Sequence, residues 1–337
     1  MESRSDKLGE IGEKEAISRI IAKYVSKPKK WERLGYPDDA RDLIPKSPRI
    51  TFSIDGFNLN SVKLPWRSLS DIGWCSIVGA ASDHVVKGSL PRDVVVSLGL
   101  PNDWTIEMLE ELYEGINDAV NEYGLRLLGG DLNYSPEPWI AVSVLGYTSI
   151  KKPPARCCGN VGDDVIVIGI YGAMGFVNIH GFEEASKYDW VVDATRRPKL
   201  YLDLAIAISS NYRYVNSSMD VSDGLGYTIL ELSRIMGKGV ELVDYPLHYR
   251  ELDSICRDEM CLWKYILNGG EEYGDVLIVN PNFTDRLVSM LEKFKIPYRI
   301  VGRVVDKEPG LYYRGIRISE YVTLYDQFMG WKPSNLN

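Results

Sequence analysis

Residues 218–225, SMDVSDGL, are the stretch of the chain that says most about its fold. The run 218–221 is predicted to be a short strand, and the apolar spacing after it predicts a helix that continues through Met236. Asp220, Ser222 and Asp223 therefore lie where a strand gives way to a helix N-terminus, which favours anions. A helix cap alone would need only one of these three polar side chains. The stretch is thus a candidate for binding phosphate and its accompanying cations.

Aspartates beside small residues recur elsewhere in the chain. Asp55 ends the β-rich run 49–55, and a predicted strand at 125–128 leads directly into the GGD run at 129–131. The two glycines remove side chains next to a carboxylate, so that backbone can approach a phosphate and its ion closely. Magnesium prefers hard oxygen ligands and is held by few carboxylates together with substrate phosphates. A single aspartate in a turn or at a helix cap, however, needs no metal to explain it. The candidate magnesium ligands are Asp38, Asp55, Asp83, Asp131, Asp220 and Asp223.

Strands and helices mix in both halves of the chain, and the first half lacks the regular alternation of a doubly wound parallel sheet. An α+β fold is therefore expected. The pattern restarts after the KKPP run at 151–154, which predicts two domains, 1–150 and 151–337. Strands are expected at 49–55, 93–98, 125–128, 139–147, 164–168, 218–221, 275–279 and 298–304. Helices are expected at 12–25, 68–86, 105–123, 201–209 and 283–294, after the glycine-bearing run 168–175, and after Leu225.

The composition limits the classes of protein to consider. With 337 residues, of which 45% are hydrophobic, the chain can bury a sizeable core. A net charge of −8 argues against a general basic surface for nucleic acid or anionic lipid. The cysteines lack the CxxC spacing of a zinc or redox site, and adjacent Cys157 and Cys158 are expected to be packing residues rather than a disulfide. No apolar run approaches the roughly 18 to 20 residues that span a bilayer, and no signal peptide is evident, so a cytoplasmic location is expected.

The order and wording of the motifs resemble thiamine-monophosphate kinases. These belong to an ATP-binding superfamily that also contains aminoimidazole ribonucleotide (AIR) synthetase, selenophosphate synthetase and a hydrogenase maturation factor. The resemblance spans nearly the whole chain, and the GGE-type motif and the final Gly-Trp favour the kinase branch. The motifs are Gly9-Glu10, Asp38-Asp39-Ala40, Ser53-Ile54-Asp55, Ala80-Ala81-Ser82-Asp83, the runs 97–101 and 156–163, Gly129-Gly130-Asp131, Arg197-Pro198, DVSDGL, the run 269–273 and Gly330-Trp331.

The resemblance implies an activity and a set of site residues. The activity is direct, in-line transfer of a phosphate from ATP to thiamine monophosphate, with Mg²⁺ held by the six aspartates and no further catalytic side chain. Ser53 and Ile54 are implied to bind the cofactor by contributing backbone or side-chain oxygen beside the magnesium ligands. Nucleotide contacts are implied at Gly130, Arg156 and Ser222, and substrate contacts at Glu271 and Trp331. The implied architecture is AIR-synthetase-like. In it an N-terminal domain binds ATP and Mg²⁺ and pairs into a dimeric β-barrel-like core, followed by a C-terminal α/β sandwich domain. Nucleic-acid and membrane partners are not expected.

The chain departs from the family pattern mainly where the family contacts its substrate. The family's His-Phe pair is absent, because residues 56–66 contain no histidine. Pro37 and Ile54 stand where relatives usually have Gly and Thr, and the EEYG run at 271–274 replaces Glu-Asp-Tyr-Glu. Two alternatives therefore stay open. One is an ATP-dependent enzyme of the same superfamily that activates an amide or carboxamide acceptor, and the other is a catalytically silent nucleotide-binding protein.

Overall fold

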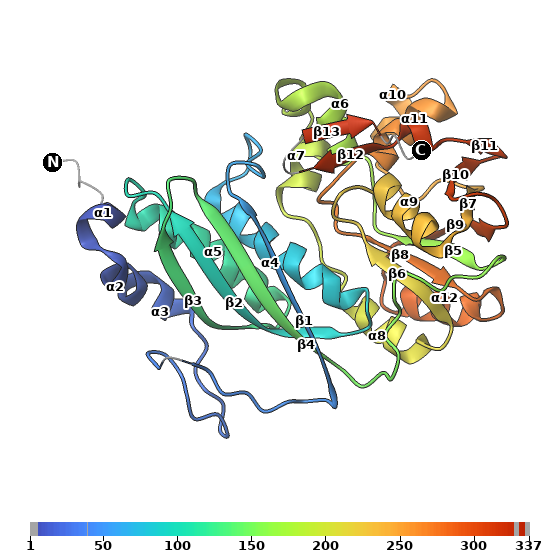
Figure 1. Cartoon of the computed structure of the whole chain (residues 1–337). Coiled ribbons are helices and arrows are strands. Elements are labelled where there is room, and N and C mark those ends of the chain that lie inside the picture. The colour runs from blue at the N-terminus through green and yellow to red at the C-terminus, as the bar shows by residue number, and fades with distance from the viewer. Residues whose placement is uncertain (1–5, 39, 327–329, 334–337) are drawn as a thin grey trace. The chain divides into compact units, whose positions relative to one another are not determined.

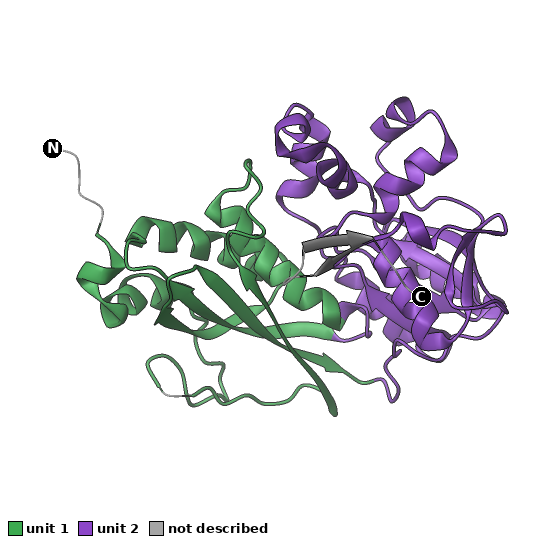
Figure 2. Ribbon diagram, turned by 45° about the horizontal axis from the view of Figure 1, so that its top comes forward, with its two compact units in different colours: residues 1–84, 90–149 green, residues 85–89, 150–337 purple. Residues whose placement is uncertain are grey.

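The computed structural model describes residues 6–38, 40–326 and 330–333. The chain forms two compact units, each of which mixes helices with strands (Figures 1 and 2). Unit 1 comprises residues 1–84 and 90–149, and unit 2 comprises residues 85–89 and 150–337. Among the described residues, no helix combines the length and the apolar character needed to cross a membrane.

Unit 1 is built on a four-stranded sheet with the strand order β1-β4-β2-β3. β2 and β3 run parallel, and the other neighbours run antiparallel. Helices α4 and α5 lie on one face of this sheet (Figure 1). The strands are β1 (Arg49–Asn58), β2 (Leu90–Leu100), β3 (Arg126–Tyr134) and β4 (Trp139–Thr148). The helices are α1 (Leu8–Ile11), α2 (Glu13–Ala16), the π-helical turn η1 (Ile17–Ile21), α3 (Ala22–Tyr24), α4 (Leu69–Val85) and α5 (Ile106–Glu122).

Two strands of unit 1 continue beyond the predicted ends. β1 passes through Asp55 to Asn58, and β3 passes through the glycines and Asp131 to Tyr134. The predictions that these strands end at Asp55 and at Leu128 are therefore wrong. The cause is tertiary, because Asp55 pairs with Val142 of β4 and the second half of β3 pairs with β2. Pairing with neighbouring strands overrides the turn preference of glycine and aspartate.

Unit 2 contains a seven-stranded sheet with the order β11-β10-β7-β9-β5-β8-β6. Strands β5 and β8 are buried at every position and apolar after their first residues, Asp164 and Asp275, as expected for strands covered on both faces. The strands are β5 (Asp164–Ile168), β6 (Val215–Asp220), β7 (Gly239–Leu242), β8 (Asp275–Val279), β9 (Tyr298–Val305), β10 (Gly310–Tyr313) and β11 (Ile316–Arg317), with β12 (Thr323–Asp326) and β13 (Gly330–Pro333) as a separate pair. The helices are α6 (Ala173–Ala185), α7 (Asp189–Arg196), α8 (Asp203–Asn211), α9 (Leu225–Met236), α10 (Glu251–Ile255), α11 (Glu259–Leu267) and α12 (Thr284–Lys293), with 3₁₀ turns η2 (Pro281–Phe283) and η3 (Ser319–Tyr321).

The adjacent cysteines in the segment before β5 form a disulfide. Cys157 and Cys158 are bonded to each other, with their Cα atoms 3.7 Å apart. The expectation that they are simple packing residues is therefore wrong. The backbone of Cys158 turns through a φ of 85° at this point, a local conformation that residue spacing does not reveal.

Candidate functional site

Two of the candidate segments, about fifty residues apart in the sequence, lie side by side in unit 2. The Glu271 N–H donates to the Ser222 carbonyl at 2.7 Å, and the Tyr273 N–H donates to the Val221 carbonyl at 3.1 Å. β6 ends at Asp220 and α9 begins at Leu225, so the DVSDGL stretch joins a strand to a helix N-terminus as predicted. The structure therefore groups the DVSDGL and GGEEY segments around the start of α9.

A buried carboxyl pair lies at the end of β6. Asp220 stands opposite Asp275 of β8 in the antiparallel register, and both residues are buried. Burial, followed by the negative charge of Asp220, raises the pKa of Asp275 well above its usual range. Its Oδ1 atom accepts no hydrogen bond within the described chain. The Lys87 ammonium offsets part of this charge and donates to the Ser218 carbonyl at 2.6 Å.

The remaining candidate aspartates lie in unit 1, on different elements. Asp38 is exposed in a turn, Asp83 is half-buried on α4, and Asp131 is exposed on β3, where it accepts a hydrogen bond from Asn133 at 2.7 Å. Asp55 accepts a hydrogen bond from the Gly56 N–H at 2.8 Å. No three His, Cys, Asp or Glu side chains are grouped for metal binding within residues 6–38, 40–326 and 330–333. Four of the candidate aspartates therefore belong to unit 1 and two belong to unit 2.

The strand register places two of these aspartates on opposite faces of the unit 1 sheet. Asp55 stands opposite Val142, which is buried beneath the helices. Asp131 stands opposite Ser97, on the same face as the exposed Val95. Because side chains alternate along a strand, Asp55 belongs to the helix-covered face and Asp131 to the uncovered face.

The predicted cofactor-binding residue Ser53 contacts a buried histidine. His84 of α4 lies 2.9 Å from the Ser53 hydroxyl through Nε2 and 2.6 Å from the Thr51 hydroxyl through Nδ1. Burial lowers the pKa of His84 to about 4, so the ring is neutral near pH 7. His84 therefore fixes two hydroxyl side chains of β1 immediately beside Asp83.

Gly130 occupies a position with no room for a side chain. A Cβ atom there would lie 2.7 Å from the Val96 carbonyl oxygen and 3.0 Å from the Tyr113 hydroxyl. That hydroxyl is buried and has no hydrogen-bond partner in the described part of the chain. Any larger residue at this position would push against β2 and α5 at once.

The other predicted contacts are spread over both units. The Ile54 side chain is 66% exposed on the uncovered face of β1. Arg156 is exposed. The pKa of Glu231 is lowered mainly by the hydrogen bond from Arg234, and the charge of Arg156 adds to this lowering. Trp331 lies in β13, where its backbone pairs with Tyr325.

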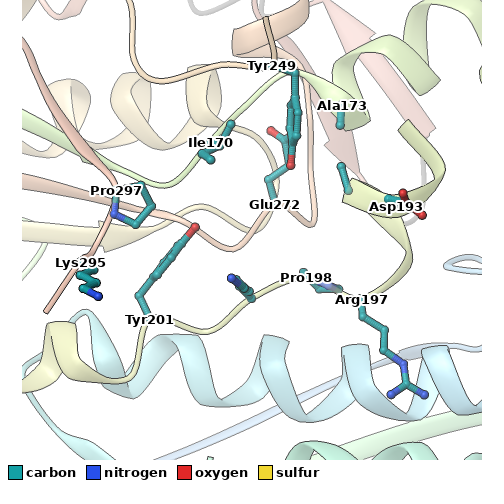
Figure 3. Close-up of a pocket in the computed structure, with 12 residues that line it drawn as sticks. Ile170, Ala173, Asp193, Arg197, Pro198, Tyr201, Tyr249, Glu272, Lys295 and Pro297 are labelled. Atoms are coloured by element: carbon teal, nitrogen blue, oxygen red, sulfur yellow. The ribbon is translucent and has the colours of Figure 1, made fainter. Parts of the chain in front are cut away.

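Unit 2 also contains a cavity that the sequence did not predict (Figure 3). Its volume is about 480 Å³, and Glu272, Tyr201 and Tyr249 contribute to its lining. The Glu272 Oε1 atom accepts hydrogen bonds from the N–H groups of Gly172 at 2.9 Å and Met174 at 3.1 Å, at the start of α6. Burial raises the pKa of Glu272 to about 8, against the lowering effect of these hydrogen bonds. Glu272 adjoins the predicted Glu271, and the second acid of the GGEEY run was the signal that could have revealed it.

Comparison with known proteins finds relatives of this chain in sequence and in fold. The family described as "AIR synthase related protein, N-terminal domain" matches residues 37–148. The chain is 28% identical over 244 residues to the thiamine-monophosphate kinase of Synechococcus elongatus, covering 70% of this chain and 72% of the relative. The structure of AaThiL complexed with AMPPCP and TMP has a TM-score of 0.69 and 25% identity, covering 94% of this chain and 97% of that one. The chain is thus similar to thiamine-monophosphate kinases over more than two thirds of its length.

A protein that is not a kinase by name has a similar fold. The hydrogenase maturation protein HypE of E. coli has a TM-score of 0.72 and 17% identity, covering 96% of this chain and 98% of that one. At this identity the likeness concerns the fold alone. The two mixed α/β units are therefore AIR-synthase-like, as the resemblance implies.

The segment that departs from the kinase family pattern forms a turn held by hydrogen bonds. Residues 56–66 contain the end of β1 and the turn that follows it. The Asn58 side chain accepts from the Asn60 N–H at 2.9 Å and donates to Glu137 at 3.1 Å, and the Ser61 hydroxyl donates to the Asn58 carbonyl at 2.7 Å. An asparagine-centred turn thus stands where the family's substrate histidine is expected.

Proposed function

We propose that this protein transfers the γ-phosphate of ATP to thiamine monophosphate, forming ADP and thiamine diphosphate. The observation that carries the proposal is the backbone pairing of DVSDGL with GGEEY at the N-terminus of α9. The kinship with thiamine-monophosphate kinases, and the AaThiL structure with AMPPCP and TMP, support the choice of both substrates.

We further propose Mg²⁺ as the metal. The candidate ligands Asp38, Asp55, Asp83, Asp131, Asp220 and Asp223 offer only hard carboxylate oxygens, which suits this ion. The buried Asp275 oxygen without a hydrogen-bond partner beside Asp220 also favours a cation at the end of β6. Bound Mg²⁺ would neutralise the phosphate charges that meet during transfer.

The protein's own contribution is to align two anions. A phosphate monoester is largely ionised near pH 7, so its oxygen can attack without a general base, and orientation supplies much of the rate. The N–H groups at the start of α9 and the Arg156 guanidinium suit phosphate oxygens. Gly130 and Ser222 are further nucleotide contacts in this proposal, Ser53 and Ile54 contribute oxygen beside the metal, and Glu271 and Trp331 contact the substrate. His84 is buried between two hydroxyls and has no role as a base in this scheme.

We propose that residues 1–150 bind ATP and Mg²⁺ and also form a homodimer, while residues 151–337 form the C-terminal AIR-synthetase-like domain. The uncovered face of the unit 1 sheet carries apolar side chains that are unusually exposed. Ile50, Phe52 and Ile54 of β1 are 46%, 68% and 66% exposed, and Val95 of β2 is 41% exposed. Alternate residues on one face of a strand form a continuous apolar patch. A second copy of the same sheet, packed face to face, would cover this patch and form the barrel-like core that the family resemblance implies.

A coupled assay of ADP release tests the kinase activity. We expect release to depend on thiamine monophosphate, and Asp131→Asn to abolish it while the circular dichroism spectrum stays unchanged. The exposed Asp103→Asn serves as the matched control and should retain full activity. Near-normal turnover by the Asp131 variant would contradict the assignment of Asp131 as a Mg²⁺ ligand. ADP release that depends instead on an amide or carboxamide compound would point to another reaction of the superfamily.

A further inference from the structure

We propose that the cavity beside Glu272 binds the acceptor of the reaction, with its amino-substituted heteroaromatic ring against Glu272 and Tyr249 and its phosphate against Lys199 and Lys295. This inference rests on the proposed kinase function and specifies the part of the site that holds the acceptor. It supplies, from residues of unit 2, the substrate contacts that the missing His-Phe pair would otherwise provide.

Glu272 gives the cavity an acceptor for an amino group. Its Oε2 atom is buried and has no hydrogen-bond partner in the described chain, whereas Oε1 is fixed by the N–H groups of Gly172 and Met174. A buried carboxyl oxygen without a partner is unfavourable, and a ligand N–H would relieve that cost. The carboxyl group is held in place before any ligand arrives, because α6 fixes its orientation.

Tyrosine side chains line the space next to this carboxyl group. In Figure 3, the Tyr249 ring lies beside Glu272, and the Tyr201 side chain projects into the cavity from another segment. The proximity of Glu272 and Tyr201 contributes, after burial, to a raised pKa of the Tyr249 hydroxyl. The ring of Trp190 packs against that of Tyr249, with 5.4 Å between the ring centroids. Aromatic walls of this kind suit a flat heteroaromatic ring.

The other lining residues carry positive charge. Lys199 and Lys295 both contribute to the cavity and are exposed, and neither forms an ion pair within the part of the chain that the structure describes. Arg197 adds a third cation, and among the described residues that line the cavity the acids are Asp193 and Glu272. A phosphate monoester is the anion that such a rim would attract. One cavity therefore combines an acidic, aromatic end with a basic rim.

The size and the place of the cavity fit this use. Its volume of about 480 Å³ is within the usual range for a small-molecule site. Glu272 directly follows Glu271, whose N–H is bonded to Ser222 in the DVSDGL segment. The cavity is thus connected through two consecutive residues to the candidate metal and phosphate segment of the same unit.

Binding of two probes to the full-length protein tests the arrangement. Isothermal titration with thiamine measures binding of the ring portion alone, and titration with thiamine monophosphate adds the contribution of the phosphate. We expect Glu272→Gln to weaken both probes by about tenfold, the loss typical of one hydrogen bond to a buried group, and Tyr249→Phe to weaken both more modestly. Lys199→Met and Lys295→Met should weaken thiamine monophosphate by about tenfold and leave thiamine unchanged. Lys293→Met, an exposed lysine outside the cavity, is the matched control.

The outcomes distinguish this inference from the proposed function. If the wild-type protein turns over thiamine monophosphate while all four cavity variants bind both probes normally, the cavity assignment is overturned and the kinase activity stands. If the wild-type protein shows no such turnover but binds thiamine in a Glu272-dependent manner, the kinase activity fails and the ring site stands. Absence of both turnover and binding overturns both. If the Glu272→Gln protein fails to fold, the lysine variants test the cavity assignment, and normal binding of thiamine monophosphate by both of them overturns it.

Discussion

Replacement of Glu272 by glutamine should change how the stability of the protein depends on pH. The carboxyl group titrates near its ordinary pKa of 4.5 in the unfolded chain and at about 8 in the folded protein, because burial disfavours its charged form. A raised pKa means that the folded protein holds this proton more tightly. The contribution of this carboxyl group to the free energy of unfolding is therefore fully present below pH 4.5 and is lost as the pH rises toward 8.

The size of the effect follows from the same two values. At about 1.4 kcal/mol for each pH unit, the loss reaches about 3 kcal/mol at pH 7 and about 5 kcal/mol above pH 8. Glutamine carries no charge at any of these pH values, and its carbonyl oxygen can still accept the N–H groups of Gly172 and Met174. The free energy of unfolding of the Glu272→Gln variant should thus rise relative to the wild type as the pH increases from 5 to 8.

Guanidinium unfolding at pH 5, 6, 7 and 8 provides the measurement. The difference between variant and wild type is the relevant quantity, because every other titrating group is shared by the two proteins. Glu183→Gln, an exposed position of the same helix α6, should give a difference that is flat with pH. Parallel stability curves for the wild type and the Glu272 variant would refute the claim that burial holds this carboxyl group in its neutral form.

Other predictions concern unit 1 and the metal. Arg126 bridges the buried carboxylates of Glu32 and Asp93, at 2.7 and 2.6 Å, so Arg126→Met should cost about 3 to 5 kcal/mol in chemical unfolding. Arg19→Met, which breaks an exposed ion pair, should cost less than about 1 kcal/mol, and equal losses would contradict the role of burial. Phe52→Asp should convert a dimer into a monomer in sedimentation velocity, and a wild type that sediments as a monomer would remove the proposed interface. Excess EDTA should abolish ADP release, which added Mg²⁺ restores, and activity that survives chelation would exclude the proposed metal.

Much of the local structure followed from the sequence. The helix expected at 105–123 is observed as α5, and the Thr105 hydroxyl caps it by accepting from the Met108 N–H at 3.3 Å. The strand and helix on either side of DVSDGL are also present. These features depend on residues within a few positions of one another, which is the range over which apolar periodicity and capping act. The motifs in their order likewise indicated the family.

The tertiary structure decided which of these segments meet. Strand pairing extended β1 beyond Asp55 and β3 beyond Asp131, and it placed the two aspartates on opposite faces of the sheet. The hydrogen bond between Glu271 and Ser222 joins motifs that the sequence presents separately. Likewise, only folding buries Glu272 and raises its pKa, because the cause is desolvation by segments distant in the chain. Local patterns could identify the candidate carboxylates, but their surroundings depend on long-range packing, which no local pattern encodes.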